Sequence, residues 1–473
     1  MNSTNLNIVS QNQAFENIKN KLEDIVKTDM LWDNIISLSG AAGTGKTYLT
    51  SKLIEQLKND YHITITAPTH KALQVLRKNL ISTDGKKVET KTLQSFLNIR
   101  LVTNYDNGKQ KFEPLKISSK DQDKTKTDIL IIDESSMVSS DLFSYIINSI
   151  EENRVKAVLF VGDEYQLLPV DNFDNKVFDI KTKYKLDKIV RQAKDSYIIN
   201  IATKARNIIK SKNYISIAEF LEDDSFCSNI EFFTQEDEFH KDFCTPDTWS
   251  QEDKVIASFK NDSVDKHNKI IRQKYWEAQD ITKIPTLLKG DKVIFQQANI
   301  IDNKPVHQNS DIVKLSSAKA TYHEKLKFNF WDCKDLNNKP FKVIDPNSKM
   351  RFDNTMDQIA KLAKNEKDYK KRIQLWKTFY HIKETFIDVK YTYASTIHKL
   401  QGSTYDTVYI DLRDIEYMND KDMMYRLLYV AITRASKNIK ILLSNSMSDS
   451  LAHYQNNILD TISNSLDELG IDL

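Results

Sequence analysis

A glycine-rich segment near the start of the chain has the composition and spacing of a phosphate-binding loop. Gly40-Ala-Ala-Gly-Thr-Gly-Lys46-Thr47 matches the pattern GxxxxGK[ST]. It lies between an apolar run that predicts a strand, Ile35 to Ser39, and a segment that predicts a helix, Tyr48 to Leu57. Glycines let backbone N–H groups turn inward around phosphate oxygens, and a helix N-terminus adds partial positive charge. We therefore expect ATP to bind through Gly40, Ala41, Ala42, Gly43, Thr44, Gly45, Lys46, Thr47 and Tyr48.

The polar side chains of this loop and of a later strand suggest the chemistry. Lys46 can reach the β- and γ-phosphates, and the Thr47 hydroxyl can ligate Mg²⁺. Further along, Ile129-Leu-Ile-Ile-Asp133-Glu134 is an apolar run that ends in two carboxylates. Successive residues at a strand end point in different directions, so Asp133 can hold Mg²⁺ while Glu134 deprotonates the attacking water. Alone, this pair is equally well explained as solvated acids; after a phosphate loop it indicates ATP hydrolysis.

Bulk composition narrows the class of protein without indicating a ligand. With 473 residues the chain exceeds what one hydrophobic core usually organises, which predicts roughly two to four domains. The formal net charge is +2, from 68 basic and 66 acidic side chains. Any surface that binds nucleic acid must therefore come from a local cluster of charge.

Cysteine usage and the longest apolar runs bear on the compartment. Cys227, Cys244 and Cys333 form no CxxC pair, which favours isolated thiols over a disulfide or zinc site. The first residues are polar and lack the pattern of a signal peptide, and the apolar runs are strand-sized. We expect a cytoplasmic protein, in the host cytoplasm if viral, with no membrane association.

Short β-branched runs alternate with segments of helical period, a pattern typical of parallel sheets flanked by helices. In the first half the predicted strands are Ile35 to Ser39, Ile63 to Ala67, Asp128 to Asp133 and Val155 to Gly162. In the second half the predicted elements are strands Val255 to Phe259, Thr407 to Asp411 and Ile439 to Ser444, with helices Ser263 to Tyr275 and Lys421 to Val430. The predicted fold class is α/β, with two such units.

Two stretches depart from this alternation. Arg100 to Leu115 alternates around Asp106-Asn107-Gly108, and Asn and Gly tolerate the positive φ of a hairpin turn. From about 290 to 388 lies an insertion with predicted strands Lys292 to Gln296 and Ile312 to Ser316. It ends in a long predicted helix that carries, on one face, Tyr369, Ile373, Trp376 and Tyr380.

Five further segments resemble, in order and spacing, the motifs of superfamily 1 helicases. They are Ala67-Pro-Thr-His-Lys-Ala72, Gly162-Asp-Glu-Tyr-Gln166-Leu-Leu-Pro169-Val, Val190-Arg191-Gln, Ala394-Ser-Thr-Ile-His398-Lys-Leu-Gln401-Gly402 and Leu428-Tyr-Val-Ala-Ile-Thr-Arg434-Ala. The first two forms are similar to those of the B group, the RecD-like and phage Dda-like helicases, and the similarity spans nearly the whole chain. The resemblance implies two RecA-like domains and ATP-driven 5′→3′ movement along single-stranded DNA that unwinds duplex.

The resemblance also implies roles for residues around the nucleotide. Gln11 would bracket the adenine, with Gln13 as the alternative. Gln401 and Gly402 would lie beside the nucleotide on the second domain. Gln166 would sense the γ-phosphate, and two arginines would reach it from the second domain as arginine fingers. The expected catalytic residues are thus Lys46, Glu134, Gln166, Arg191 and Arg434. Arginines outside such motifs more often form surface ion pairs.

Polar residues of three motifs would form a track for DNA. Short hydroxyls and backbone N–H groups can hold phosphates without reading sequence. A helix cap or a core histidine is the structural alternative for each single residue. The expected contacts are Pro68, Thr69, His70, Thr92, Gln94, Ser95, Ser395, Thr396 and His398.

The two irregular stretches resemble accessory parts of the same family. The hairpin resembles a strand-separating pin, with Phe112 or Tyr105 near the base pair that is split; an ordinary surface hairpin is the alternative. The insertion resembles an SH3-like 2B domain with a helical tower. Within it, Lys361 to Lys377 carries seven basic residues on an expected helix, which could contact DNA or the pin or be a solvated face.

The expected organisation is 1–180 as RecA-like domain 1A with the pin at about 99–116, 181–289 and 389–473 as domain 2A, and 290–388 as domain 2B. Expected partners are single-stranded DNA and forks between single and double strands, with the chain as a monomer and single-stranded-DNA-binding or replication proteins as further candidates. An RNA or RNA–DNA helicase is one alternative function. A nucleic-acid-binding protein with a vestigial ATP site is another, disfavoured by the intact Lys46, Glu134 and Gln166.

Overall fold

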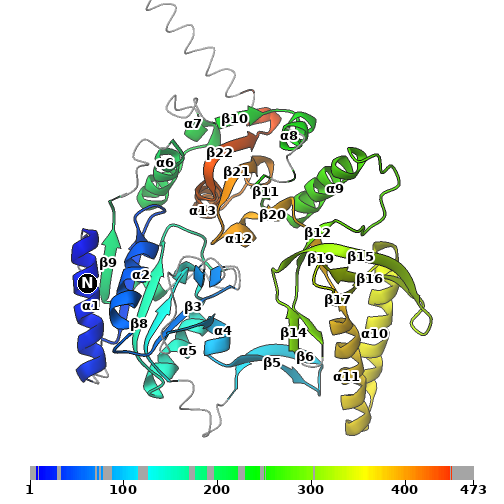
Figure 1. Ribbon diagram of the computed structural model, residues 1–473, viewed down its shortest axis with the longest axis horizontal. Coiled ribbons are helices and arrows are strands. Elements are labelled where there is room, and N and C mark those ends of the chain that lie inside the picture. The colour runs from blue at the N-terminus through cyan, green and yellow to red at the C-terminus, as the bar shows by residue number, and fades with distance from the viewer. Residues whose placement is uncertain are drawn as a thin grey trace, which may run out of the picture.

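Three units of sheet and helix make up the part of the chain that the structure describes (Figure 1). The computed structural model describes residues 7–8, 10–28, 33–69, 72–73, 76–77, 88–115, 126–169, 176–188, 197–221, 230–245, 250, 252–301, 304–447 and 449. Within these ranges, no helix combines the length and the apolar character needed to cross a membrane.

The first unit is built on a seven-stranded parallel sheet with the order β1-β9-β2-β8-β7-β3-β4. Its elements are β1 Asn7–Ile8, α1 Gln11–Thr28, β2 Ile35–Gly40, α2 Lys46–Leu57, β3 Ile63–Ala67, β4 Val88–Thr92, α4 Leu93–Phe96, β7 Thr127–Ile132, η2 Ser135–Met137, α5 Ser140–Glu151, β8 Val155–Gly162, η3 Lys176–Phe178 and β9 Thr182–Leu186. Successive side chains of a strand point to opposite faces. On β7, Ile129 and Ile131 therefore pack with α1 and α2, whereas Leu130 and Ile132 pack with α4 and α5.

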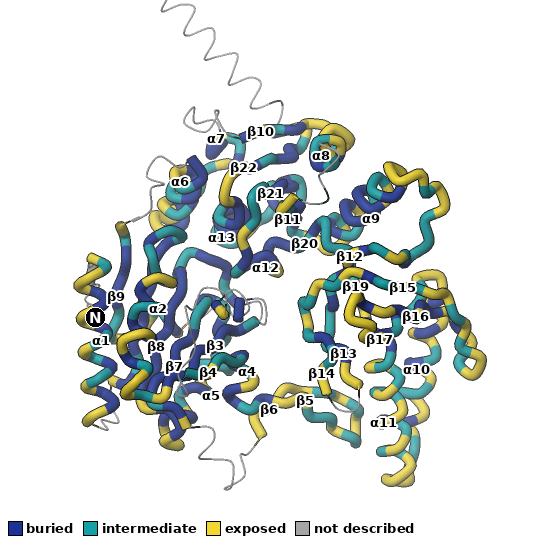
Figure 2. Tube along the Cα trace, in the orientation of Figure 1, coloured by how far each residue is buried: buried dark blue, intermediate teal, exposed yellow. Residues whose placement is uncertain are grey.

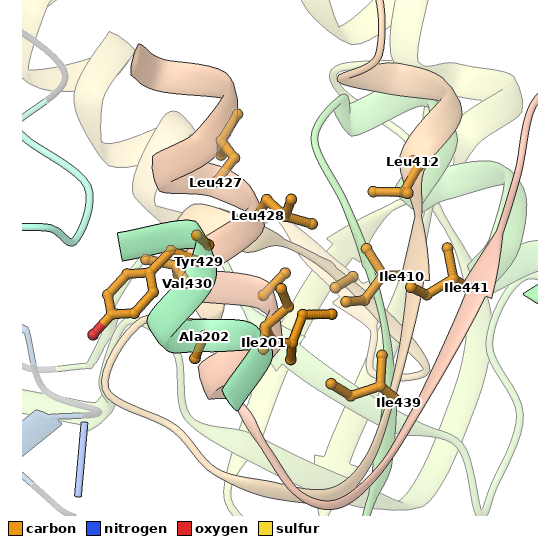
Figure 3. Close-up of a cluster of buried hydrophobic side chains, with 14 of the residues drawn as sticks. Ile201, Ala202, Ile410, Leu412, Leu427, Leu428, Tyr429, Val430, Ile439 and Ile441 are labelled. Atoms are coloured by element: carbon orange, nitrogen blue, oxygen red, sulfur yellow. The ribbon is translucent and has the colours of Figure 1, made fainter. Parts of the chain in front are cut away.

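The second unit is a five-stranded parallel sheet with the order β10-β22-β21-β11-β20. Its elements are α6 Tyr197–Ser211, α7 Ile217–Leu221, β10 Ile230–Phe233, α8 Glu236–Phe243, β11 Lys254–Ser258, α9 Asn261–Glu277, β20 Ala394–Thr396, α12 Ile397–Leu400, β21 Tyr405–Asp411, η7 Leu412–Asp414, α13 Lys421–Thr433 and β22 Ala435–Leu442. Helices α6 and α13 cover one face, where Ile201 and Leu428 pack with Ile410 and Ile439 (Figure 3). Helices α8 and α9 cover the other face. Two parallel α/β units confirm the predicted fold class.

The third unit is the insertion, a six-stranded and mostly antiparallel sheet with the order β18-β17-β16-β15-β12-β19. Its elements are β12 Lys292–Phe295, β13 Asn299–Ile301, β14 Lys304–His307, β15 Ile312–His323, β16 Phe328–Asp335, β17 Pro340–Ile344, η6 Pro346–Ser348, α10 Lys349–Asn365, α11 Tyr369–Thr385, β18 Phe386–Ile387 and β19 Val389–Tyr391. Its core contains Val293, Phe295 and Trp331. Figure 2 shows that the strands of the parallel sheets are largely buried, whereas α10 and α11 are exposed along much of their length.

The expectation of one basic helix over Lys361 to Lys377 is wrong. Helix α10 ends at Asn365 and α11 begins at Tyr369. The Asp368 carboxylate accepts a hydrogen bond from the backbone N–H of Lys371, which is an N-cap that starts a new helix. The basic side chains are therefore divided between two antiparallel helices and their turn.

Two predicted domain boundaries also differ from the structure. Strand β9 follows residue 180 yet pairs with β1 and β2 in the first sheet. Strand β19 follows residue 388 yet pairs with β12 in the insertion. Strand β9 has lysines between its apolar residues and β19 has only three residues, so the apolar pattern of the sequence did not reveal them; their places depend on pairing with distant strands.

The predicted hairpin is confirmed as β5 Ile99–Asn104 and β6 Lys109–Pro114, and its turn docks on the insertion. Arg372 Nη2 of α11 donates to Asp106 Oδ1 at 2.8 Å, and the Tyr380 hydroxyl donates to the Gly108 carbonyl at 2.5 Å. A Cβ on Gly108, whose φ is +68°, would lie 2.1 Å from Cη2 of Trp376. Glycine is therefore required where the turn meets the indole. In Figure 1 the hairpin spans from the first unit to α11.

Candidate nucleotide-binding site

The phosphate loop connects β2 to α2, as the sequence predicts. Gly43 and Gly45 have φ values of +80° and +85°, a conformation that glycine adopts without a steric cost. Lys46 Nζ donates to the carbonyls of Gly40 at 2.5 Å and Ala41 at 2.9 Å. Thr47 and Tyr48 are exposed on the first turn of α2. The loop thus presents a cation and a helix N-terminus together.

Of the two candidate glutamines, Gln11 is the one at the loop. Its Nε2 donates to the Thr44 carbonyl at 3.0 Å, and a Cβ on Gly45 would lie 1.8 Å from the same nitrogen. Gln13 instead accepts hydrogen bonds from the backbone and hydroxyl of Ser10. Gly45 therefore leaves the space that the Gln11 side chain occupies.

Asp133 and Glu134 follow β7 directly. Glu134 has a φ of +50°, which turns the chain sharply after the strand. Burial, followed by the charge of Glu134, raises the pKa of Asp133 to about 7, while the nearby Lys46 lowers it. The carboxylates of Asp133 and Glu134 together carry more negative charge than the single ammonium group of Lys46 can balance. Together with the Thr47 hydroxyl, their oxygens form a donor set of the kind that Mg²⁺ prefers, so the residues fit this ion.

The second unit faces the phosphate loop and the two carboxylates through Gln401 and Gly402. Gln401 Nε2 donates to Gln166 Oε1 at 2.9 Å and to the Ser136 hydroxyl at 3.1 Å, which joins the units. A Cβ on Gly402 would lie 3.7 Å from Glu134 Oε1, so its backbone approaches the carboxylates closely.

Arg434 of the second unit is 6% exposed. Its Nε donates to the Val430 carbonyl at 3.1 Å and its Nη1 to the Ser403 carbonyl at 3.0 Å. Burial lowers the pKa of this guanidinium, and the charge of Glu134 opposes that shift. Because Arg434 holds the residue after Gly402, and Gly402 approaches Glu134, the guanidinium lies on the side of the second unit that faces the first unit's carboxylates. Arg191 lies outside the described residues.

Two residues of α13 to which the sequence analysis gave no role also cross to the first unit, and one of them, Tyr429, stands in the motif that contains Arg434. The Tyr429 hydroxyl donates to Asp163 Oδ2 at 2.6 Å and accepts from the Ala42 N–H at 3.4 Å. Arg426 Nη1 donates to the carbonyls of Glu164 at 2.7 Å and Gln166 at 2.8 Å. In the sequence Arg426 fits an ordinary amphipathic helix, and the motif resemblance gave a role to Arg434 but none to Tyr429. The available signal was a tyrosine in a buried aliphatic run, since a buried hydroxyl needs a partner.

The first two groups of expected DNA contacts lie at one edge of the first sheet. Strands β3 and β4 are parallel neighbours, so Thr69 and Thr92 leave the sheet on the same side. Thr92 is 8% exposed and its hydroxyl accepts the Ser95 N–H, which caps α4. Pro68 is buried, Gln94 is half-buried and Ser95 is exposed. The accessible groups are therefore Thr69, Gln94 and Ser95; His70 lies outside the described residues.

The third group lies on the second unit. Ser395 and Thr396 belong to β20, the edge strand, and His398 follows on α12. The ring centroid of His398 lies 6.0 Å from that of Phe259, and burial lowers the pKa of the histidine. Ser395 and His398 are half-buried, whereas Thr396 is buried. A neutral imidazole beside an aromatic ring offers a flat surface rather than a charge.

The expected pin aromatics occupy different places on the hairpin. Phe112 is 65% exposed on β6, directly opposite Leu101, which is 45% exposed. Tyr105 is half-buried in the turn that docks on α11. Phe112 is therefore on a strand face and not at the tip, and Leu101 extends the same exposed apolar surface.

A separate cluster of titratable groups lies between α8, which carries Glu236 and His240, and α9, which carries His267. His240 Nε2 and His267 Nδ1 are 2.7 Å apart, whereas two ligands of a tetrahedral zinc ion lie roughly 3.3 Å apart. Asp411 Oδ2 lies 2.9 Å from His267 Nε2. Lys266 and Arg413 already neutralise Glu236. We interpret the cluster as a buried hydrogen-bonded relay that fixes α8 and α9 to β21.

Comparison with known proteins agrees with this geometry. Residues 23–219 match the family model described as AAA domain, and residues 391–441 match the UvrD-like helicase C-terminal domain. The chain is 28% identical to the ATP-dependent DNA helicase dda of Enterobacteria phage T4, over 90% of this chain and 98% of that protein. It is 24% identical to the RecBCD enzyme subunit RecD of Buchnera aphidicola, over 92% of this chain and 74% of that protein.

A solved structure of two coordinating Pif1 helicases at forked double-stranded DNA shares the fold, with a TM-score of 0.50 and 18% identity over 93% of this chain and 94% of that one. Fold and site therefore define a P-loop protein with two RecA-like domains that are in contact beside the phosphate loop. Within that class, the chain is similar over nearly its whole length to superfamily 1B of the helicases, the group that contains Dda and RecD.

Proposed function

We propose that the protein is an ATP-dependent DNA helicase that moves 5′→3′ along single-stranded DNA as a monomer and unwinds duplex at forks. The observation that carries the proposal is the set of contacts that joins the two units beside the phosphate loop. Gln401 donates to Gln166 across the boundary, and Arg434 holds the carbonyl of Ser403, next to the glycine that approaches Glu134. A nucleotide site at such a boundary changes shape when the bound triphosphate becomes diphosphate.

In the proposed reaction, water attacks the γ-phosphorus and the bond to the bridging β–γ oxygen breaks. Glu134 accepts the proton of the attacking water, and ADP leaves with that oxygen. Lys46 and Arg434, together with Arg191, stabilise the negative charge that develops on the γ-phosphoryl oxygens. Thr47 and Asp133 would hold Mg²⁺, which supplies further neutralisation of the phosphates when bound.

The negative γ-phosphate is the group that positively charged side chains of both units contact. Its loss removes that attraction, so the two units move apart. Gln166 detects this loss and reports it through Gln401, which follows the DNA-contacting residues Ser395 and His398 in the chain. Alternating grip by the two units then gives directed steps. The 5′→3′ direction rests on the resemblance to the RecD-like group. The hairpin would separate strands at the fork, with Phe112 and Leu101 against the exposed base.

Forked duplexes with either a 5′ or a 3′ single-stranded tail test this proposal. We expect ATP-dependent unwinding of the 5′-tailed fork alone. Lys46→Ala should abolish DNA-stimulated phosphate release and leave binding of single-stranded DNA unchanged, because the lysine lies in the phosphate loop and is not one of the expected DNA contacts. Stimulation by RNA in preference to DNA would favour an RNA helicase, and absence of stimulated hydrolysis by the unaltered protein would refute a motor.

A further inference from the structure

Tyr429 is a core residue of one unit whose polar end lies in the other. The residue is 1% exposed on α13, and its ring packs in the main core of the second unit. Figure 3 shows the hydroxyl pointing away from the aliphatic side chains of that cluster. There it donates to Asp163 Oδ2 at 2.6 Å and accepts from the Ala42 N–H at 3.4 Å. One hydroxyl thus contacts the phosphate loop and the segment that leads to Gln166.

These two contacts differ in strength. The Asp163 carboxylate is 1% exposed and otherwise accepts the Tyr165 N–H at 3.1 Å, so the short bond from Tyr429 satisfies a buried charge. Charge-assisted bonds of this kind are roughly twice as strong as neutral ones. The 3.4 Å bond from Ala42 is long, and a phosphate oxygen is a stronger acceptor than a phenol. A bound nucleotide therefore takes the Ala42 N–H and leaves the Asp163 bond in place.

The position of Tyr429 on its helix connects these contacts to Arg434. Helix α13 ends at Thr433, and Arg434 Nε donates to the carbonyl of Val430, the residue after Tyr429. A shift of Tyr429 relative to the phosphate loop consequently moves the backbone that holds the guanidinium.

We propose that Tyr429 is a positioning residue: its hydroxyl transmits the occupancy of the phosphate loop to α13 and so sets Arg434 for hydrolysis. This inference rests on the proposed ATPase function and adds to it a residue of the second unit that senses the loop directly. Tyr429→Phe removes only the hydroxyl and keeps the buried ring, so it isolates this contact.

The chain offers a matched control one turn earlier on the same helix. Tyr425 is fully buried, and its hydroxyl donates to the Ile215 carbonyl at 3.2 Å, within the second unit. With saturating single-stranded DNA, we expect Tyr429→Phe to lower the kcat of ATP hydrolysis about tenfold, which corresponds to about 1.4 kcal/mol. Its KM for ATP should stay within about twofold, and Tyr425→Phe should keep both constants. Equal loss in both variants, or no loss in Tyr429→Phe, would overturn the proposal.

A second measurement does not depend on turnover. Hydrogen exchange of peptides covering the phosphate loop and α13 is compared with and without a non-hydrolysable ATP analogue. In the unaltered protein and in Tyr425→Phe, the analogue should slow exchange in both regions; in Tyr429→Phe it should slow the loop alone. If the analogue slows exchange in α13 equally in all three proteins, or in none of them, the coupling through Tyr429 is refuted. A loop that does not respond in the unaltered protein refutes the proposed ATP site instead.

Discussion

Gly108→Ala should separate ATP hydrolysis from unwinding, because it disrupts the contact between the hairpin and α11. The new Cβ would lie 2.1 Å from Trp376 Cη2, and φ is +68° there. Trp376 is 2% exposed and packs edge-on against Phe379, so removing its indole from this packing costs about 3–5 kcal/mol. The polar contacts that hold the turn are weaker. The Tyr380 bond contributes about 1 kcal/mol, and the exposed Arg372–Asp106 pair contributes less than about 1 kcal/mol. The hairpin therefore moves and the indole stays.

Unwinding of a forked duplex in a single turnover measures the effect, with DNA-stimulated ATP hydrolysis measured in parallel. We expect Gly108→Ala to reduce the unwinding rate about tenfold or more, since losing about 1.4 kcal/mol of docking already shifts the docked population tenfold. ATP hydrolysis should stay within about twofold because the hairpin is remote from the pocket. Asp106→Ala removes only the exposed ion pair with Arg372 and should change the unwinding rate little. Unwinding by Gly108→Ala at the rate of the unaltered protein would refute the need for docking.

Three further outcomes are expected. Phe112→Ala should weaken unwinding and spare DNA-stimulated ATP hydrolysis, because only strand separation uses the exposed ring; equal loss of both activities would contradict this. Burial lowers the pKa of His240 to about 4, so between pH 6.5 and 4 the unfolded chain binds more protons than the folded one, and stability falls as the pH falls. The loss from pH 7 to pH 5 should be about 2 kcal/mol in urea unfolding, and an unchanged pH slope in His240→Gln would argue against this origin. Gln401→Ala should lower kcat for hydrolysis about tenfold, and combining it with Gln166→Ala should add little, because the two amides share one bond; additive losses would show that they act separately.

Chemistry that depends on local spacing could be predicted from the sequence. The phosphate loop needs its glycines, lysine and hydroxyl at fixed positions, and the paired acids need a strand before them, so both sites could be located without a structure. The buried strands were equally accessible, because a parallel sheet covered on both faces requires continuous apolar runs. Elements such as β7 and β8 therefore lie within a residue or two of their predicted positions.

Features that depend on long-range pairing or on a single cap could not be predicted in this way. Strand β9 has the alternation of a surface segment, and only its pairing with β1 and β2 places it in the first sheet. The division of the basic segment depends on the hydrogen bond that Asp368 accepts, which breaks an otherwise good helical pattern. Tyr429 has the sequence character of a core residue, and its role follows from where its hydroxyl points.

The contacts between the two RecA-like units suggest how the units could move apart and together around a bound nucleotide. Those that the structure describes at Gln401, Arg426 and Tyr429 are hydrogen bonds from side chains, and each contributes about 1–2 kcal/mol. A ligand must favour one state by about 5.5 kcal/mol to move a two-state equilibrium from 1:99 to 99:1. A triphosphate contacted by charged groups of both units can supply a difference of that size, and removal of one phosphate can reverse it. Leu167 of the first unit also packs in the core of the second unit, so the contacts between the units are not only polar. The hydrogen bonds at Gln401, Arg426 and Tyr429 are the contacts that a change of nucleotide could break and re-form.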